Sequence, residues 1–195
     1  PRNIACVLHG FSMLNVSPGQ AINRSCMYLE KKLRKLDPKS TTLLFAALAK
    51  LKIYKIRFVH QLADHVVGNM DQFTTSQLCT IFHSLAKLAI FHRALVARIL
   101  EQNFQTMTEI DFALFTYSLG QFRIRNNLVW EPLFERFNQE LLILSPQSVS
   151  MFVAAVSRVE DQSKQGFDII SYKRVDPASL GMVNGVWLKR IGKHI

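Results

Sequence analysis

The chain has 195 residues, 49% of them hydrophobic and 19% charged, which is enough apolar content for a buried core and too much for a disordered chain. Lys and Arg outnumber Asp and Glu by 24 to 14, and the formal net charge of +10 favours a polyanionic partner or an acidic surface over an acidic small substrate. The longest apolar runs, such as residues 43–49, stop far short of the roughly 20 residues that a membrane-spanning helix needs, so such a helix is excluded.

The predicted helices recur in pairs along the chain. The first helix of each pair ends in a similar short block, and the blocks follow one another at intervals of 37, 37, 34 and 37 residues. In chain order these blocks end at Leu14, Leu51, Leu88, Phe122 and Val159. A period of 34 to 37 residues accommodates two short helices and two turns. The sequence therefore predicts an all-α fold, an α-solenoid of about five helix-turn-helix repeats.

These repeats divide the chain into one domain and a tail. The solenoid is expected over residues 1–162, with units at roughly 1–36, 37–73, 74–107, 108–144 and 145–162. Apolar spacing predicts the second helices of the first four units at 18–36, 56–69, 92–104 and 127–143. Residues 163–195 lose the pattern and contain several Gly, so we expect an irregular basic tail or a capping segment there.

The start of the first helix is marked at one fixed offset, fourteen residues before the end of each of the last four blocks. The residues at this offset are Asp37, Thr74, Thr108 and Ser145. Their side-chain oxygens can accept hydrogen bonds from the exposed N–H groups of a first helical turn. Thr74 with Gln77 three residues later also has the pattern of a capping box. Each of these residues is therefore predicted to be an N-cap.

Two columns of small residues run through the same alignment. The column four residues before each end contains Gly10, Ala47, Ser84, Ser118 and Ala155, and the column two before it contains Ser12, Ala49, Ala86, Gly120 and Ser157. The residues seven and three before each end are apolar, beginning with Val7 and Phe11. Small side chains let one helix axis approach another closely, so we expect these columns to lie at helix contacts. The three cysteines, Cys6, Cys26 and Cys79, have no metal-ligand spacing and are expected to be small buried residues.

Two segments resemble a known family of helical repeats. The segments FTTSQLCTIFHSLAKLAI (73–90) and LSPQSVSMFVAAVSRV (144–159) resemble the first helix of octotricopeptide repeats, and the period of 37 is closer to heptatricopeptide repeats. Both types are similar to RAP-domain and FASTK-like proteins. The resemblance implies an organellar, often mitochondrial, RNA-associated role in the matrix. The chain starts at Pro1, and we expect it to be a processed or partial chain whose targeting segment is not visible.

The first helices of a solenoid usually line its concave side, and the columns twelve, five and one before each end share that face. Their polar members are Arg2, His9, Lys39, Lys50, His83, Lys87, Tyr117, Gln121, Gln147 and Arg158. Cations can neutralise phosphates, and His or Tyr rings can stack on unpaired bases. The alternative is that the cations near the helix ends only complement the helix dipole.

A second basic feature is a run on the second helix of the first unit, where Arg24, Lys31 and Lys35 are expected on one stripe. The full run is Arg24, Lys31, Lys32, Arg34 and Lys35, and inter-helix turns or starts add Lys52, Lys55, Arg57, Arg93, Arg123 and Arg125. The tail contributes Lys173, Arg174, Lys189 and Arg190. Such cations either contact RNA phosphates or form a solvated helix face and a flexible tail.

The sequence contains no recognised enzyme motif. There is no GxxxxGK[ST], GxGxxG or GxSxG pattern, and the six His residues lack metal-ligand spacing. We therefore predict no catalytic residue, no metal, no cofactor and no small-molecule substrate.

The distribution of charge favours one of two functions. Residues 1–70 have a net charge of +8, residues 71–162 of −2 and residues 163–195 of +4. We expect an RNA-binding structural subunit of an organellar ribosome or related ribonucleoprotein, which contacts rRNA or an organellar transcript through its basic N-terminal repeats and tail, beside other protein subunits. The alternative is a protein interaction scaffold of a large organellar complex without direct RNA contact.

Overall fold

The computed structural model describes residues 1–102 and 107–160, so the predicted tail at 163–195 lies outside the described residues. In these ranges the regular structure is entirely helical, with nine α-helices and two short 3-10 turns, which confirms the predicted all-α class. The α-helices are α1 (Arg2–Met13), α2 (Gly19–Glu30), α3 (Pro38–Lys50), α4 (Ile56–Gly68), α5 (Thr75–Leu88), α6 (Arg93–Leu100), α7 (Glu109–Gln121), α8 (Asn127–Glu140) and α9 (Pro146–Glu160). The 3-10 turns are η1 (Leu33–Lys35) and η2 (Met70–Gln72).

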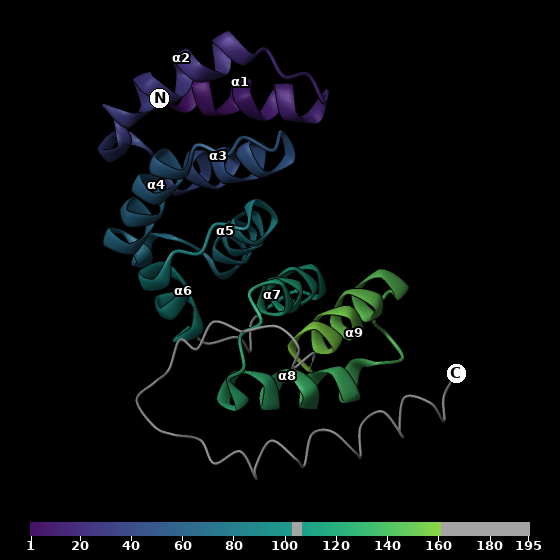
Figure 1. The fold of residues 1–195 in the computed structure, drawn as a ribbon. Coiled ribbons are helices and arrows are strands. Elements are labelled where there is room, and N and C mark those ends of the chain that lie inside the picture. Colours follow the sequence, from purple (N-terminus) through teal and green to yellow (C-terminus); the bar gives the residue numbers. More distant parts are fainter. Residues whose placement is uncertain (103–106, 161–195) are drawn as a thin grey trace.

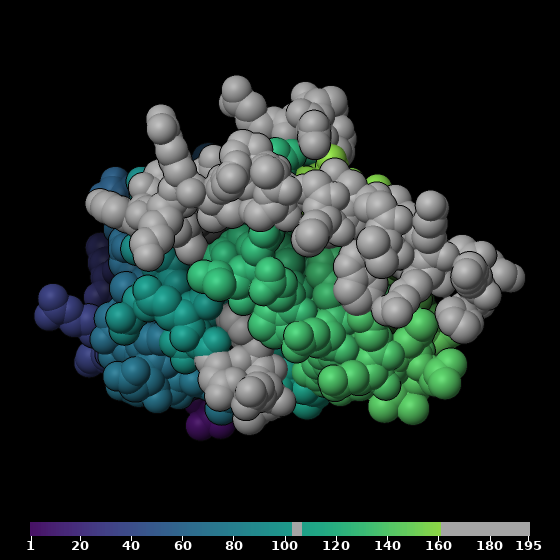
Figure 2. All heavy atoms as spheres, turned by 90° about the horizontal axis from the view of Figure 1, so that it is seen from below, coloured from purple at the N-terminus to yellow at the C-terminus, as the bar shows by residue number. Residues whose placement is uncertain are grey.

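The odd-numbered helices form a stack. Helix α1 packs on α3, α3 on α5, α5 on α7 and α7 on α9, while α2 contacts α4 and α4 contacts α6 (Figure 1). In the view from below, green and teal atoms of the later helices fill the centre and the purple atoms of the first hairpin show only at the edges (Figure 2). Helices α1 and α9 therefore lie at opposite ends of the stack.

The stacked helices bury residues on two faces, which we name by direction. The forward face packs on the following odd-numbered helix, and the backward face packs on the preceding one. The end helices each bury one face: α1 buries Ala5, Leu8 and Ser12, and α9 buries Ser148, Phe152 and Ala155. Helices α3, α5 and α7 bury the equivalents of both sets, except Thr42 and Gln77, which are half-buried. The repeated columns of the sequence are therefore the two sides of one recurring helix contact.

The small residues lie at these contacts, as the sequence predicts, except at the two ends. Eight of the ten are buried, whereas Gly10 is half-buried and Ser157 is exposed. The closest approach joins α7 to α9: a Cβ atom placed on Gly120 would lie 2.5 Å from the Cα of Ala155 and 2.7 Å from its Cβ. Gly120 belongs to a forward face and Ala155 to a backward face, so the register of the contact can be read from this pair.

Three expectations for α1 are wrong, two of them for the same reason. Val7 and Leu14, which the repeat pattern places in the core, are 54% and 74% exposed, and Cys6 is exposed although Cys26 and Cys79 are buried. Val7 and Leu14 belong to the backward face of α1. No helix among the described residues precedes α1, so nothing in these ranges covers that face.

All four predicted N-caps are confirmed. Asp37 accepts a hydrogen bond from the backbone N–H of Ser40 at 2.7 Å, and the Ser145 hydroxyl accepts one from Ser148 N at 3.3 Å. Thr74 forms the predicted capping box with Gln77. Thr108 forms a capping box with Asp111, which the sequence analysis did not identify. The caps fix where each first helix begins and therefore which residues reach the contact faces.

The ends of the first helices also repeat, through a turn that the sequence analysis missed. One residue after the end of each of the first four blocks the backbone is left-handed, with φ values of 54°, 53°, 52° and 51° at Asn15, Lys52, Ala89 and Arg123. In each case the next N–H donates to the carbonyl five residues earlier, as Ile53 does to Leu48 at 2.9 Å and Ile90 to Leu85 at 3.1 Å. This is the Schellman arrangement, usually built on glycine.

Replacing Ala89 with glycine should stabilise the protein. Alanine in a left-handed conformation costs about 1 kcal/mol relative to glycine. Ala89 is exposed, so no buried contact is lost. We expect the free energy of unfolding to rise by about 0.5–1 kcal/mol in urea titrations. The control Ala46→Gly lies inside α3 and should instead cost about 1 kcal/mol. A lower urea midpoint for Ala89→Gly would contradict the assignment of strain to this turn.

The second helices depart from their predicted bounds, and one departure affects the basic run. Helix α2 ends at Glu30, and Lys35 lies in the separate 3-10 turn η1. The predicted helical stripe of Arg24, Lys31 and Lys35 is therefore wrong. The chain leaves the helix because η1 packs against α4, which lets Leu36 reach the core at 6% exposure. Helix α8 also ends before its predicted bound, at Glu140, and Leu142 two residues later is 97% exposed.

Candidate nucleic-acid interface

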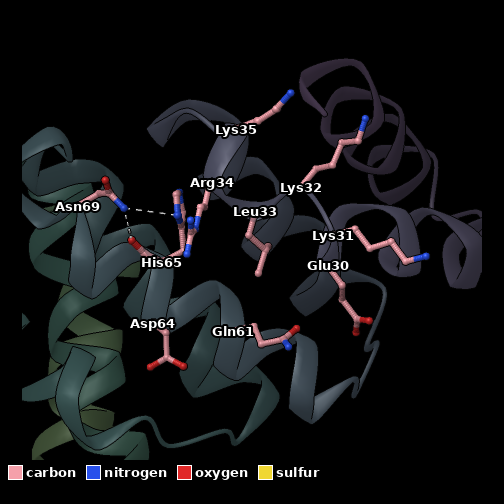
Figure 3. A pocket seen from close by; sticks show the side chains of 10 residues that line it. All are labelled: Glu30, Lys31, Lys32, Leu33, Arg34, Lys35, Gln61, Asp64, His65 and Asn69. Carbon is pink, nitrogen blue, oxygen red and sulfur yellow. Dashed lines mark hydrogen bonds between the residues drawn. The ribbon is translucent and has the colours of Figure 1, made fainter.

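A pocket of about 590 Å³ lies between the end of α2, η1 and the outer side of α4. We call it the basic pocket. It is lined by Glu30, Lys31, Lys32, Leu33, Arg34, Lys35, Gln61, Asp64, His65 and Asn69 (Figure 3). Residues 30–35 supply four cations, and α4 supplies the polar wall opposite them. The pocket therefore brings together four of the predicted RNA-binding residues and adds a polar wall from the next hairpin.

The polar wall is held by hydrogen bonds. His65 Nε2 donates to the carbonyl oxygen of Leu36 at 3.2 Å, which joins α4 to the end of η1. With the proton on Nε2, Nδ1 is an acceptor and lies 3.4 Å from Asn69 Nδ2. The same Asn69 amide donates to the backbone oxygen of His65 at 2.8 Å (Figure 3). These bonds fix two of the wall's side chains before any ligand arrives.

The cations of the basic pocket have no carboxylate partner among the described residues. The ion pairs described in these ranges are His92–Asp64, Arg98–Glu101 and Arg136–Glu140. Asp64, one of the two acids at the pocket, is thus bonded to His92 Nε2 at 3.1 Å. Lys32 Nζ lies 4.9 Å from the centre of the Tyr28 ring. The excess positive charge at the pocket is therefore available to an anion such as a phosphate.

Gln61 adds a buried acceptor to this pocket. Its Oε1 is buried and has no hydrogen-bond partner among the described residues. An unpaired buried acceptor is costly, and a donor that binds there regains the lost hydrogen bond. A ribose hydroxyl beside a phosphate would supply such a donor. The cations of the pocket and this acceptor together therefore suit a ribose-phosphate backbone.

The other predicted cations of the first two hairpins lie outside the lining of the basic pocket. Arg24 is exposed on α2, and Lys52 and Arg57 are exposed at and after the turn that follows α3, with Lys55 half-buried between them. Lys39 is exposed near the start of α3. Arg2 helps to lower the pKa of Asp37, a shift caused first by the hydrogen bond from Ser40 N–H. The structure thus separates the N-terminal cations into a pocket and a scattered set.

The residues that were predicted for the concave side of the first helices form contacts from one helix to the next. Lys50 Nζ lies 3.6 Å from the sulfur of Met13. The rings of His83 and Tyr117 have centroids 5.0 Å apart, and the Arg158 guanidinium lies 5.4 Å from the centre of the Tyr117 ring. His9 has a buried Nδ1 without a partner among the described residues. The columns chosen from the sequence therefore do share one face of the stack.

Arg123 and Arg125 hold the adjacent helix. Arg123 Nη1 donates to the backbone oxygen of Arg158 at 3.4 Å, and Arg125 Nε donates to that of Val159 at 3.1 Å. Both guanidinium groups thus bond the last carbonyls of α9, where a cation also complements the helix dipole. Arg93 is exposed at the start of α6. The predicted tail cations Lys173, Arg174, Lys189 and Arg190 lie outside the described residues.

The α4 side of the basic pocket was not predicted from the sequence. Gln61, His65 and Asn69 lie 37 residues after Arg24, Tyr28 and Lys32, so they occupy the same columns one period later. Polar residues at these positions, which face the preceding second helix, could have indicated this wall from the sequence. These columns were not recognised because the alignment rested on the first helices alone.

His83 makes stability depend on pH. Burial, followed by the charge of Lys87, lowers the pKa of His83 from 6.5 to about 4. Between these values the unfolded chain binds a proton that the folded chain does not, so the stabilising contribution is complete above pH 6.5 and is lost as the pH falls toward 4. We expect the urea midpoint to fall over this window, and to fall less in His83→Phe, which keeps a ring beside Tyr117. Identical pH profiles for the two proteins would contradict this prediction.

Within residues 1–102 and 107–160 no group of three or more His, Cys, Asp or Glu side chains is placed to hold a metal ion. No helix in the same ranges is both long and apolar enough to cross a bilayer. Comparison with known proteins adds no family, because no protein-family model matches this sequence and no curated protein matches it significantly.

Proposed function

We propose that this chain is an α-solenoid that binds RNA through its N-terminal repeats, and that it acts as a structural subunit of a mitochondrial ribosome or related ribonucleoprotein. The observation that carries the proposal is the basic pocket, where four cations within residues 31–35 lack a carboxylate partner among the described residues. The organellar part rests on the resemblance of residues 73–90 and 144–159 to octotricopeptide and heptatricopeptide repeats. The role is binding, without a catalytic step.

The chemistry of the pocket favours contact with the backbone of RNA. The Lys and Arg side chains neutralise phosphates, and Gln61 Oε1 accepts from a ribose hydroxyl. Contacts of this kind position an RNA without reading its bases. Tyr117 already contacts His83 and Arg158, so we assign the groove of the first helices a smaller part than the pocket.

A protein scaffold is the second candidate, and exposed apolar residues support it. Tyr54 and Ile56 are each 59% exposed, and Leu128 is 80% exposed. Scattered apolar residues are ordinary on a protein surface, but several in one small domain favour further protein contacts. A subunit of a ribonucleoprotein makes both kinds of contact. A scaffold without RNA contact would use the cations of the basic pocket for solubility or for docking to an acidic neighbour.

The test is the salt dependence of RNA binding combined with cross-linking. We expect the full chain to bind a labelled single-stranded RNA with a log affinity that falls linearly with log salt, by about 0.7 per phosphate contacted. Ultraviolet cross-links should map to residues 24–69, which contain the basic run and α4. Failure to bind at low salt, or cross-links confined to other residues, would overturn the proposal and favour the scaffold.

A further inference from the structure

The exposed face of α1 has the composition of a buried one. Val7 is 54% exposed, whereas the residues in the same column on the later helices, Leu44, Ile81, Phe115 and Phe152, are at most 1% exposed. Leu14 is 74% exposed, against 2% for Leu88 and 3% for Phe122. We propose that this backward face of α1 is a docking surface for a partner helical hairpin of the same repeat type.

The space above Gly10 fits a close helix. A Cβ atom placed on Gly10 would meet no heavy atom within 4 Å. The residue in the same column on α9 is Ala155, whose Cα lies 2.5 Å from the Cβ position of Gly120 on α7. Gly10 therefore leaves α1 able to receive a helix as closely as α9 receives α7. Continuity with the contacts inside the stack makes a helix the natural occupant of this face.

The face is also unlike the end of an isolated solenoid. The terminal repeats of such proteins carry a polar outer face, because they have no neighbour on one side. Here Val7 and Leu14 are accompanied on the first hairpin by exposed Met27 and Tyr28 of α2. The positions of Met27 and Tyr28 one period later are Asp64 and His65, which line the pocket that faces the preceding hairpin. The open surface therefore continues from α1 onto α2.

The contacts between the stacked helices indicate which side chains a partner helix should present. The forward faces that pack inside the stack have a small residue two positions before the end of each repeated block, as in Ser12, Ala49, Ala86 and Gly120. Four residues earlier they carry Leu8, Phe45, Phe82 and Thr116, all buried. The partner helix should present the same spacing of a bulky and a small side chain. Because Arg24 of α2 occupies the column of Gln61, which faces the preceding hairpin, the second helix of the partner should be acidic or neutral.

The test supplies such a hairpin to the full chain. A copy of residues 38–74, one period long, is fused ahead of Pro1, so that Thr74 of the copy takes the place of the N-cap before α1. The copy carries the forward face with Phe45 and Ala49. We expect hydrogen exchange of the α1 amides to slow on the order of tenfold, and the urea midpoint to rise. Unchanged exchange in α1 in the fused protein would overturn the proposal.

Two variants separate docking from general stabilisation. Val7→Glu should abolish the protection in the fused protein and change the original chain little, because Val7 is exposed there. Leu128→Glu, at an exposed apolar residue of α8, should leave the protection intact. Equal effects of Val7→Glu in both proteins would contradict docking. Self-association of the original chain that Val7→Glu abolishes would identify a second copy as the occupant and overturn the hairpin assignment. Neither readout depends on RNA, so the proposed function stands or falls separately.

Discussion

Gly120→Ala should destabilise the protein by about 1–3 kcal/mol, although alanine is the better helix former. The added Cβ would lie 2.5 Å from the Cα and 2.9 Å from the backbone oxygen of Ala155. Both are backbone atoms, so no side chain can rotate to relieve the clash. Relief requires α9 to move away from α7 along their whole contact.

The packing around α9 makes that movement costly. Phe152 stacks on Phe137 with ring centroids 4.1 Å apart and lies 5.5 Å from Phe112 on α7. Shifting α9 would open gaps among these rings, because closely packed interiors transmit strain rather than absorb it. The gain of about 1 kcal/mol from replacing glycine in a helix reduces the net loss and does not reverse it.

Gly10→Ala is the matched control and should have the opposite sign. Gly10 also lies in one of the small-residue columns and inside a helix, but its Cβ position has no heavy atom within 4 Å. We therefore expect about 0.5–1 kcal/mol of stabilisation from helix propensity. The free energies of unfolding from urea titrations, with circular dichroism as the signal, give both values. Changes of the same sign would show that Gly120 is not set by the α7–α9 contact.

These two glycines show how far the sequence can predict the fold. The repeat, the N-caps and the contact columns follow from residue types at fixed offsets, since caps and close helix contacts admit few side chains. The alignment predicts that Gly10 and Gly120 both lie at helix contacts. They differ because Gly120 meets a following helix, whereas no helix among the described residues precedes α1. Which column faces which neighbour requires the three-dimensional stack.

The turns and the basic pocket were beyond sequence reasoning for other reasons. The left-handed turns contain Asn15, Lys52, Ala89 and Arg123, so the glycine that usually marks such a turn is missing. Helix α2 ends at Glu30 through packing of η1 on α4, which no local propensity reports. The cations of the pocket were identified from the sequence, but their opposing wall on α4 was not. Tertiary contacts decide both features.

Replacing Lys31, Lys32, Arg34 and Lys35 with glutamine should have the largest effect on RNA binding. These four cations line one pocket, and removing four phosphate contacts should make the slope of log affinity against log salt less steep by about 3. At low salt, where such contacts contribute most, the loss of affinity should be greatest. The residues lie at the end of α2 and in η1, so circular dichroism should show an unchanged helical content.

A second set of four cations distinguishes the effect of the pocket on RNA binding from the effect of net charge. Arg2, Lys39, Lys87 and Arg93 are exposed and lie outside the lining of the basic pocket, and their change to glutamine removes the same charge. We expect this set to reduce the salt slope by less than half as much as the first. Equal reductions would mean that RNA responds only to the overall field of a basic protein, and would remove the pocket from the proposed function.

Gln61→Met adds a test without a change of charge, because losing the buried acceptor should reduce the preference for RNA over DNA of the same sequence.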